Sequence, residues 1–392
     1  MHYLDYAATT PMHPEAFAAM TPWLQGGYGN ASSVYALGRE ARKAVEEARA
    51  KIAAAIGAEK NEIYFTSGGT EADNWAIKGA ARAKLRKGKH IITTAIEHHA
   101  VLHAAEALEK QGYDITYLPV DEMGLITAEQ VAEAIRPDTV LVTVMMANNE
   151  IGTLQPIADI GAVCRQRGVW LHTDAVQAVG HVPVDVKAMK IDMLSLSGHK
   201  FGGPKGVGVL YLRAGVVLPP MLDGGAQERG RRAGTENVAG IVGMGRALEL
   251  SIEAMPEETR RLTALRERLI EGLLARIPEI RVNGHREQRL PGNANVSIRY
   301  IEGEALLLRL DLAGIAASSG SACTSGSLDP SHVLLAIGLP HEIAHGSLRL
   351  TLGHHSTEAD VDAVLETLPG IVDSLRSMSP LFAQQTQQAS GV

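Results

Sequence analysis

Two residues, Lys200 and Asp174, have the side chains and the positions that a covalent cofactor chemistry needs. Lys200 follows the alternating apolar segment 192–196 and precedes a glycine-rich turn, so we expect it at the end of a buried strand. Asp174 ends another apolar segment, 169–174. A lysine amine in a cleft can form a Schiff base with an aldehyde cofactor, and a carboxylate can keep a pyridine nitrogen protonated. Taken singly, each has an ordinary alternative: an exposed lysine after a strand, and an aspartate in a turn or helix cap.

The segment 66–71, Thr-Ser-Gly-Gly-Thr-Glu, has the pattern of a phosphate-binding turn. It lies between an expected strand (62–65) and an expected helix that runs to about residue 83. Free backbone N–H groups and the positive end of the helix dipole meet at such a turn, and both attract a phosphate. An ordinary strand-to-helix turn capped by Thr70 explains the same pattern equally well.

Apolar segments alternate with helical patterns along the first part of the chain, which predicts an α/β fold with a mostly parallel sheet. The segments are 62–65, 90–94, 113–118, 139–145, 169–174, 192–196 and 207–212. Asn149, Asp174 and Lys200 each follow one of them, and ligands of parallel sheets bind at the carboxyl ends of the strands. The coincidence of the three residues supports a ligand site more strongly than any one of them.

The second part of the chain has a different pattern. We expect helix over 237–277 with a break near Pro256, then strands at 295–300 and 347–352 and helices at 304–312, 332–337 and 357–375. The predicted organisation is a large domain over residues 15–255 and a smaller α+β domain formed by residues 1–14 and 256–376. The polar tail 377–392 is expected to be frayed.

The composition narrows the classes of function. The chain has 392 residues, a net charge of −7 and a pI near 6.1, which argues against a nucleic-acid-binding or anionic membrane surface. Neither a secretion signal nor an apolar run of about 18 residues is present, so no membrane partner is expected. Two cysteines give neither a disulfide framework nor a cysteine-rich zinc site, which fits a reducing cytoplasm.

The two cysteines have contrasting surroundings. Cys164 lies in the apolar-periodic segment 160–166 and is expected to be a small core residue. Cys323 lies in the segment 318–327, which consists of Ser, Gly, Ala and Thr apart from the cysteine itself. That segment offers little apolar area to bury, so a mobile loop with a working thiol is expected.

Short motifs along nearly the whole chain resemble those of the cysteine desulfurases, in the class V aminotransferase-like superfamily. They lie, in the order of the family, at 3–5, 7–11, 28–30, 65–71, 97–98, 147–150, 172–177, 197–200, 231–237 and 318–327. The resemblance implies the fold type I architecture of pyridoxal-phosphate-dependent transferases and the conversion of L-cysteine to L-alanine. Segments 227–237 and 289–327 look most like the nitrogen-fixation (NifS) group, with the housekeeping (IscS) group as the alternative.

The resemblance also implies a role for each matching residue. Lys200 holds the cofactor and moves the proton, Asp174 pairs with the ring nitrogen, Gln177 contacts the ring hydroxyl and His98 stacks on the ring. Gly69, Thr70, Ser197 and His199 surround the phosphate, with Thr235 from a second subunit. Asn149 and Arg349 bind the substrate carboxylate, and Cys323 receives the sulfur. Because the thiol of Cys323 has to lose its proton before it attacks, an acid–base group is needed, and His98 is the candidate.

The implied partners are L-cysteine, a second copy of the chain and an iron–sulfur scaffold protein that accepts the sulfur. No resident metal is implied, and Cys323 would ligate a nascent cluster only transiently. The alternatives are a transaminase or selenocysteine lyase of the same superfamily, and a cofactor-free scaffold that only presents Cys323. Tyr6, Ala31 and Tyr35 depart from the usual residues of the family and leave the N-terminal contacts of the site open.

Overall fold

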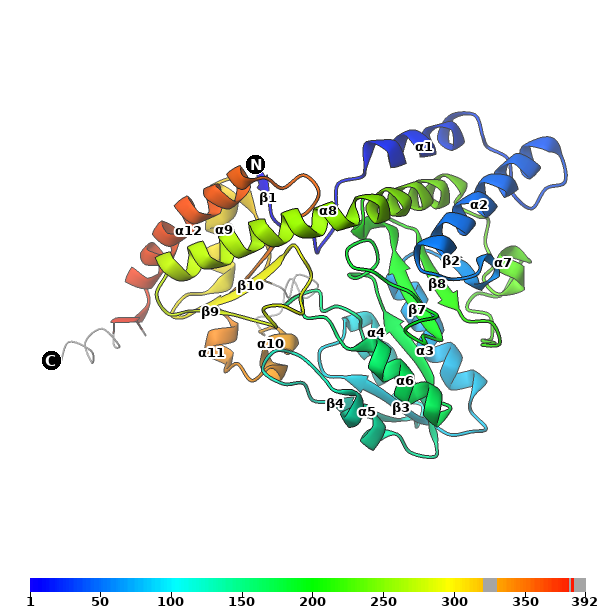
Figure 1. Cartoon of the computed structure of the whole chain (residues 1–392), viewed down its shortest axis with the longest axis horizontal. Coiled ribbons are helices and arrows are strands. Elements are labelled where there is room, and N and C mark those ends of the chain that lie inside the picture. Colours follow the sequence, from blue (N-terminus) through cyan, green and yellow to red (C-terminus); the bar gives the residue numbers. More distant parts are fainter. Residues whose placement is uncertain (320–329, 381, 384–392) are drawn as a thin grey trace.

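The computed structural model describes residues 1–319, 330–380 and 382–383, and a seven-stranded sheet is its largest element (Figure 1). The strands are β2 (Ile63–Thr66), β3 (His90–Thr94), β4 (Asp114–Leu118), β5 (Thr139–Thr143), β6 (Trp170–Asp174), β7 (Met193–Ser197) and β8 (Gly208–Leu212), in the spatial order β2-β8-β7-β6-β5-β3-β4. All neighbours from β7 to β4 pair in parallel, whereas β8 pairs antiparallel with both β2 and β7. The prediction of a mostly parallel sheet is confirmed.

The antiparallel direction of β8 follows from its short connection to β7. Only η2 (Gly198–Lys200) and a glycine-rich turn separate the two strands. A parallel return would need a crossover of a dozen or more residues, usually a helix. The consequence for the site is that Lys200 lies in the tight turn at the end of β7.

Helices cover both faces of the sheet, as a buried parallel sheet requires. The helices of this part of the chain are α1 (Pro14–Gln25), α2 (Ala36–Ala55), α3 (Gly69–Ala83), α4 (His99–Glu109), α5 (Ala128–Ala134), α6 (Ile157–Arg167) and the short α7 (Gln227–Gly230). Of these, α1 packs on α8 rather than on the sheet. Successive strand residues alternate between two hydrophobic clusters, since Val209 packs in one and Leu210 in the other. Cys164 on α6 is 1% exposed, which confirms its prediction as a core residue.

Helix α8 (Val238–Arg276) is continuous over 39 residues, so the predicted break near Pro256 is wrong. Proline removes one helical hydrogen bond, but Pro256 is exposed, where water can bind the carbonyl that loses its partner. The helix packs against α1 and α2 with one half and against α12 (Glu358–Ser377) with the other, and this tertiary packing holds the two halves in line (Figure 1). No helix within the described residues is long and apolar enough to span a membrane.

A second group of elements lies at the other end of α8 (Figure 1). It comprises the antiparallel sheet β12-β10-β9 (Ser347–Thr351, Asn293–Ile298 and Ile280–Val282), the parallel pair β1 (His2–Tyr3) and β11 (Ile315–Ala316), and the helices α9 (Gly303–Leu312), α10 (His332–Ala336), α11 (His341–Ala344) and α12. Apart from α10 and α11, these elements share a separate hydrophobic cluster that includes Leu4 from the N-terminal segment. Residues of α10 and α11 pack instead with Ile96, Met145 and Ile151 of the larger group. The short strands β1, β9 and β11 were not predicted, because two or three residues carry too little periodicity.

Candidate active site

A cavity of about 360 Å³ beyond the ends of β6 and β7 brings together most of the predicted site residues. Its predicted lining residues are Gly69, Thr70, His98, Asn149, Asp174, Gln177, Ser197, His199, Lys200 and Arg349. Thr235 does not line this cavity; it is exposed in a separate hollow with Arg232 and Glu228. Cys323 and most of its predicted mobile loop lie outside the described residues.

The N-terminal segment holds the amine of Lys200. The Nζ atom donates hydrogen bonds to the backbone carbonyls of Ala7, at 2.6 Å, and Ala8, at 2.8 Å. The carbonyl of His199 accepts from the backbone and the side chain of Thr10, which ties the same segment to η2. The lysine is therefore oriented by a part of the chain about 190 residues away in sequence.

Asp174 is the last residue of β6 and is 6% exposed. Its Oδ1 accepts the backbone N–H of Val176 at 2.9 Å. Burial raises the pKa of this carboxyl to about 6, while the Val176 N–H and the charge of Lys200 act in the opposite direction. A cationic ring nitrogen beside Asp174 would favour its ionised form further.

The N-terminus of α3 faces the cavity through Gly69 and Thr70. No side chain of the described residues caps this helix, so its first N–H groups are available to an anion. A Cβ at Gly69 would come within 2.7 Å of Val176 Cγ2, so a larger residue there would displace that side chain or the first turn of the helix. Ser197 and His199 line the same region, and burial with the charge of Lys200 lowers the pKa of His199 to about 4.

His98 is the N-cap of α4, and its Nδ1 accepts the backbone N–H of Ala100 at 3.1 Å. Burial lowers the pKa of this imidazole to about 4, with smaller contributions from the charges of Lys200 and of neighbouring histidines. The side chain is therefore neutral at neutral pH, which leaves it able to take up a proton.

Arg349 on β12 reaches the cavity from the smaller group of elements and is 3% exposed. Its Nη2 pairs with Asp5 Oδ1 at 2.9 Å, and its Nη1 donates to the carbonyl of Asn149 at 3.0 Å. Its Nε has no hydrogen-bond partner among the described residues. A buried guanidinium with an unused donor is suited to bind a carboxylate.

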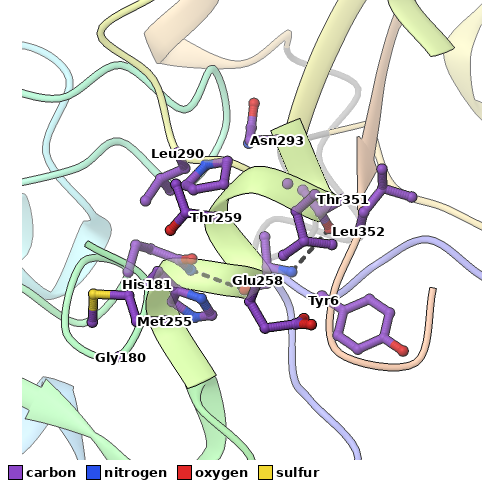
Figure 2. Close-up of a pocket in the computed structure, with 15 residues that line it drawn as sticks. Tyr6, Gly180, His181, Met255, Glu258, Thr259, Leu290, Asn293, Thr351 and Leu352 are labelled. Atoms are coloured by element: carbon purple, nitrogen blue, oxygen red, sulfur yellow. Dashed lines mark hydrogen bonds between the residues drawn. The ribbon is translucent and has the colours of Figure 1, made fainter. Parts of the chain in front are cut away.

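Gln177 and Ala7 line both this cavity and a smaller one of about 50 Å³. Gln177 Nε2 donates to the carbonyl of Ala7 at 2.9 Å. Tyr6, one of the departures from the family pattern, lines the smaller cavity with residues of α8 and β12 (Figure 2). It does not line the cavity of Asp174, but it lines a third cavity, of about 380 Å³, together with Lys200. The departure therefore lies next to the segment that holds Lys200.

The chain on either side of Cys323 is attached beside the site. Ser318 exchanges backbone hydrogen bonds with Arg349, at 3.3 and 2.6 Å. After the undescribed residues, the Ser331 hydroxyl donates to the carboxyl group of Glu150, the neighbour of Asn149. Ser318 precedes Cys323 by five residues, which span at most about 17 Å when fully extended.

Sequence reasoning missed three kinds of contact at this site. Asp5 belongs to a matching motif, but its pairing with Arg349 joins residues 344 positions apart and leaves no local signal. The carbonyls of Ala7 and Ala8 are invisible in a sequence because every residue carries one. Asp73, which also lines the cavity, lies in the helical pattern after the glycine turn and has the appearance of a surface residue.

Comparison with known proteins extends these observations. The model of the family "Aminotransferase class-V" matches residues 2–364. A "Cysteine desulfurase IscS" from Methanosarcina thermophila is 59% identical over 383 residues, which cover 98% of this chain and 95% of the relative. A solved "NifS-like protein" is 37% identical with a TM-score of 0.90, covering 95% of this chain and 99% of that one. A structure described as "SspA in complex with cysteine" is 39% identical with a TM-score of 0.80, covering 90% and 99%.

The matched family model covers both groups of elements and every described residue of the cavity. The resemblance of the motifs, the mostly parallel sheet and the similarity to solved structures agree with one another. The chain belongs to the aminotransferase class-V family.

Proposed function

We propose that this protein is a pyridoxal-phosphate-dependent cysteine desulfurase that converts L-cysteine to L-alanine and leaves the sulfur on Cys323 as a persulfide. The observation that carries the proposal is the single cavity that gathers an amine, a carboxyl group, an imidazole and a guanidinium, from Lys200, Asp174, His98 and Arg349. The 59% identity to a curated cysteine desulfurase supports it along nearly the whole chain.

The side chains of the cavity fit pyridoxal phosphate. The uncapped N-terminus of α3, with Ser197 and His199, offers donors for the phosphate. Asp174 offers a carboxylate for the ring nitrogen, and Lys200 offers the amine for the aldehyde. When bound, the cofactor supplies a positively charged ring that accepts electrons from a substrate carbanion.

Arg349 and Asn149 bind the carboxylate of L-cysteine in this proposal. The guanidinium is already fixed by Asp5, so little side-chain freedom is lost when the substrate binds. Lys200 then takes the proton from the substrate Cα and returns it to a neighbouring carbon. Its amine suits this role because its hydrogen bonds to the N-terminal segment fix its position in the cavity.

Cys323 then attacks the substrate sulfur as a thiolate. The new S–S bond forms as the Cβ–S bond breaks, and the carbon that loses sulfur takes up a proton to give alanine. His98 is neutral at neutral pH and can accept the thiol proton. The positions of Ser318 and Ser331 support this role, because they attach the chain on both sides of Cys323 next to Arg349 and Glu150.

The persulfide sulfur passes to an iron–sulfur scaffold protein in this proposal. The 59% identical relative named IscS favours the housekeeping role over a role in nitrogenase maturation. Expression of this protein in a host that lacks its own housekeeping desulfurase tests the assignment. A housekeeping enzyme should restore growth on fixed nitrogen, whereas a nitrogen-fixation enzyme would restore nitrogenase activity in preference to such growth. The cytoplasmic location stays a prediction from the low cysteine count.

We further propose a homodimer and a division into a large unit (15–255) and a small unit (1–14 with 256–376). Separate hydrophobic clusters in the two groups of elements support the division. Exposed apolar side chains on and beside α1 support a second copy of the chain: Phe17, Leu24, Tyr28 and Val34 are 57, 63, 82 and 85% exposed.

The absorption spectrum with pyridoxal phosphate, followed by alanine release from L-cysteine, tests the function. The parent protein should become yellow and release alanine, with stoichiometric persulfide on Cys323. Lys200→Ala should lose covalent attachment and turnover, and Cys323→Ala should keep the bound cofactor but form no persulfide. A colourless parent protein, or normal alanine release by Lys200→Ala, would overturn the proposal.

A further inference from the structure

Asp73 is a buried carboxyl group for which the proposed reaction gives no role. It lies on α3, lines the cavity and is 1% exposed. Its Oδ1 atom has no hydrogen-bond partner among the described residues. A buried, ionised carboxylate with one oxygen left unbonded costs several kcal/mol, so the neutral acid is favoured.

A chain of polar side chains from the central strands surrounds Asp73. His172 Nε2 lies 3.6 Å from Asp73 Oδ1 and 2.9 Å from Ser195 Oγ. His172 Nδ1 lies 2.8 Å from Thr143 Oγ1, and the Ser195 hydroxyl also acts on the carboxyl group of Asp73. All of these side chains are buried, so water does not screen them.

The nearest charge that acts on Asp73 is negative. Burial raises the pKa of Asp73 well above its usual value, the charge of Asp174 raises it further, and the Ser195 hydroxyl lowers it. Glu97 adds little charge at neutral pH, because burial raises its own pKa to about 8. His172 supplies no compensating charge, because burial lowers its pKa to about 3. The positive charge of Lys200 acts on Asp174 instead. Two buried carboxyl groups that interact in this way hold one proton between them.

We propose that Asp73 is a positioning residue of the cofactor site: a neutral carboxylic acid that leaves Asp174 as the single negative charge facing the ring nitrogen. The inference rests on the proposed function, since it needs a cofactor ring at Asp174. If Asp73 were ionised, its repulsion would favour protonation of Asp174, which would weaken the pairing with a cationic ring. The neutral state of Asp73 therefore protects the charge of Asp174.

Infrared spectroscopy of the full-length, cofactor-free protein tests the proton directly. Carboxyl-¹³C aspartate shifts the C=O stretch of a protonated aspartic acid and leaves protonated glutamic acids such as Glu97 unshifted. The parent at pH 7.5 should show one shifted band that Asp73→Asn removes and Glu97→Gln retains. The same band in the parent protein should vanish when the pH is raised above the pKa of Asp73, because the acid then loses its proton. This second readout needs no variant. Absence of the band, or its removal by Asp174→Asn alone, would overturn the proposal.

The pH dependence of pyridoxal phosphate affinity tests the consequence. Asparagine has the shape of a neutral aspartic acid, so Asp73→Asn should change the affinity less than about threefold, against tenfold or more for Asp174→Asn, which removes a charged pair. The acid limit of binding should stay at the same pH. A shift of that limit to lower pH in Asp73→Asn would show that Asp73 is ionised and overturn the proposal. If the parent binds no pyridoxal phosphate, the proposed function fails while the infrared band still decides the state of Asp73.

Discussion

Arg349 is oriented from two sides by its own chain. Asp5 Oδ1 and the carbonyl of Asn149 each bind one terminal nitrogen of the guanidinium, and both partners come from segments far from β12 in sequence. The planar group can hold these partners and still present donors to a carboxylate, whereas an ammonium is a single point of charge. The residue type is therefore as important as the charge.

Arg349→Lys should raise the KM for L-cysteine about tenfold or more, because lysine cannot replace the planar fork. Pyridoxal phosphate affinity should stay unchanged, since the proposal assigns Arg349 to the substrate carboxylate and not to the cofactor. Alanine release as a function of L-cysteine concentration measures the first quantity, and titration of the cofactor-free protein measures the second. Arg299→Lys, in an exposed pair with Glu279, is the matched control and should behave as the parent. An unchanged KM in Arg349→Lys would contradict the assigned role.

His172 makes the stability of the protein depend on pH. Burial lowers its pKa from 6.5 to about 3 in the folded chain. Below pH 6.5 the unfolded chain binds a proton that the folded chain does not bind until about pH 3, so the neutral imidazole stabilises the fold above pH 6.5, and this stability is lost as the pH falls.

Between pH 7 and pH 5, the free energy of unfolding of the parent should therefore fall by about 2 kcal/mol more than that of His172→Gln. Urea titrations at the two pH values measure the difference, and a general loss of stability in the variant cancels. The exposed His341→Gln should keep the drop of the parent. Equal drops in the parent and in His172→Gln would show that the buried imidazole is not the cause.

At the scale of the element, the position of the first turn of α3 depends on the absence of a side chain at Gly69. Gly69 lies where a Cβ would come within 2.7 Å of Val176 Cγ2, at the edge of the cavity that has to admit a phosphate. Gly370 on α12 is the opposite case, because its Cβ would meet nothing within 4 Å. The two helical glycines form a matched pair.

Gly69→Ala should lower the affinity for pyridoxal phosphate about tenfold or more, because the first turn has to shift away from the phosphate site. Gly370→Ala should keep the affinity and stabilise the protein by roughly 0.5–1 kcal/mol, the usual gain of alanine over glycine inside a helix. Cofactor titration and thermal unfolding followed by circular dichroism give the two readouts. Equal cofactor affinity in both variants would mean that α3 does not form the phosphate site.

At the scale of the whole molecule, Thr235 lines a hollow that is separate from the cavity of Lys200. It lies beside the phosphate turn, to which the pair Arg232 and Glu71 connects it at 2.8 and 3.0 Å. Thr235 itself is exposed and does not line the cavity of Lys200. A second copy of the chain is the simplest way for this residue to reach a cofactor.

Mixed dimers of Lys200→Ala and Thr235→Val chains should therefore regain cofactor binding and activity at one site of each dimer. The Lys200 of one chain would be completed by the Thr235 of the other, so the mixed population should exceed the sum of the two separate variants. Light scattering checks that the mixture is dimeric. If mixing restores nothing, or if a monomer is fully active, Thr235 is not supplied by a second subunit.

The sequence by itself determined the alternation of strands and helices, the polar residues at strand ends and the buried state of Cys164. These features are local: apolar periodicity places a segment in the core, and glycine-rich turns end strands where a ligand binds. For that reason Asn149, Asp174 and Lys200 could be assigned to one edge of the sheet before any coordinates were known. The continuity of α8 through Pro256 could not, because packing against α1, α2 and α12 outweighs a local preference.

Only the tertiary structure decided which distant groups meet. The carbonyls of Ala7 and Ala8 hold Lys200, and Asp5 orients Arg349, across separations of 192 to 344 residues. Asp73 has an ordinary place in a helical pattern, and it becomes an isolated buried acid because α3 packs its face against β6 and β7. Side-chain charge and hydrogen bonding depend on neighbours in space, and those neighbours are fixed only when the layers of the fold come together.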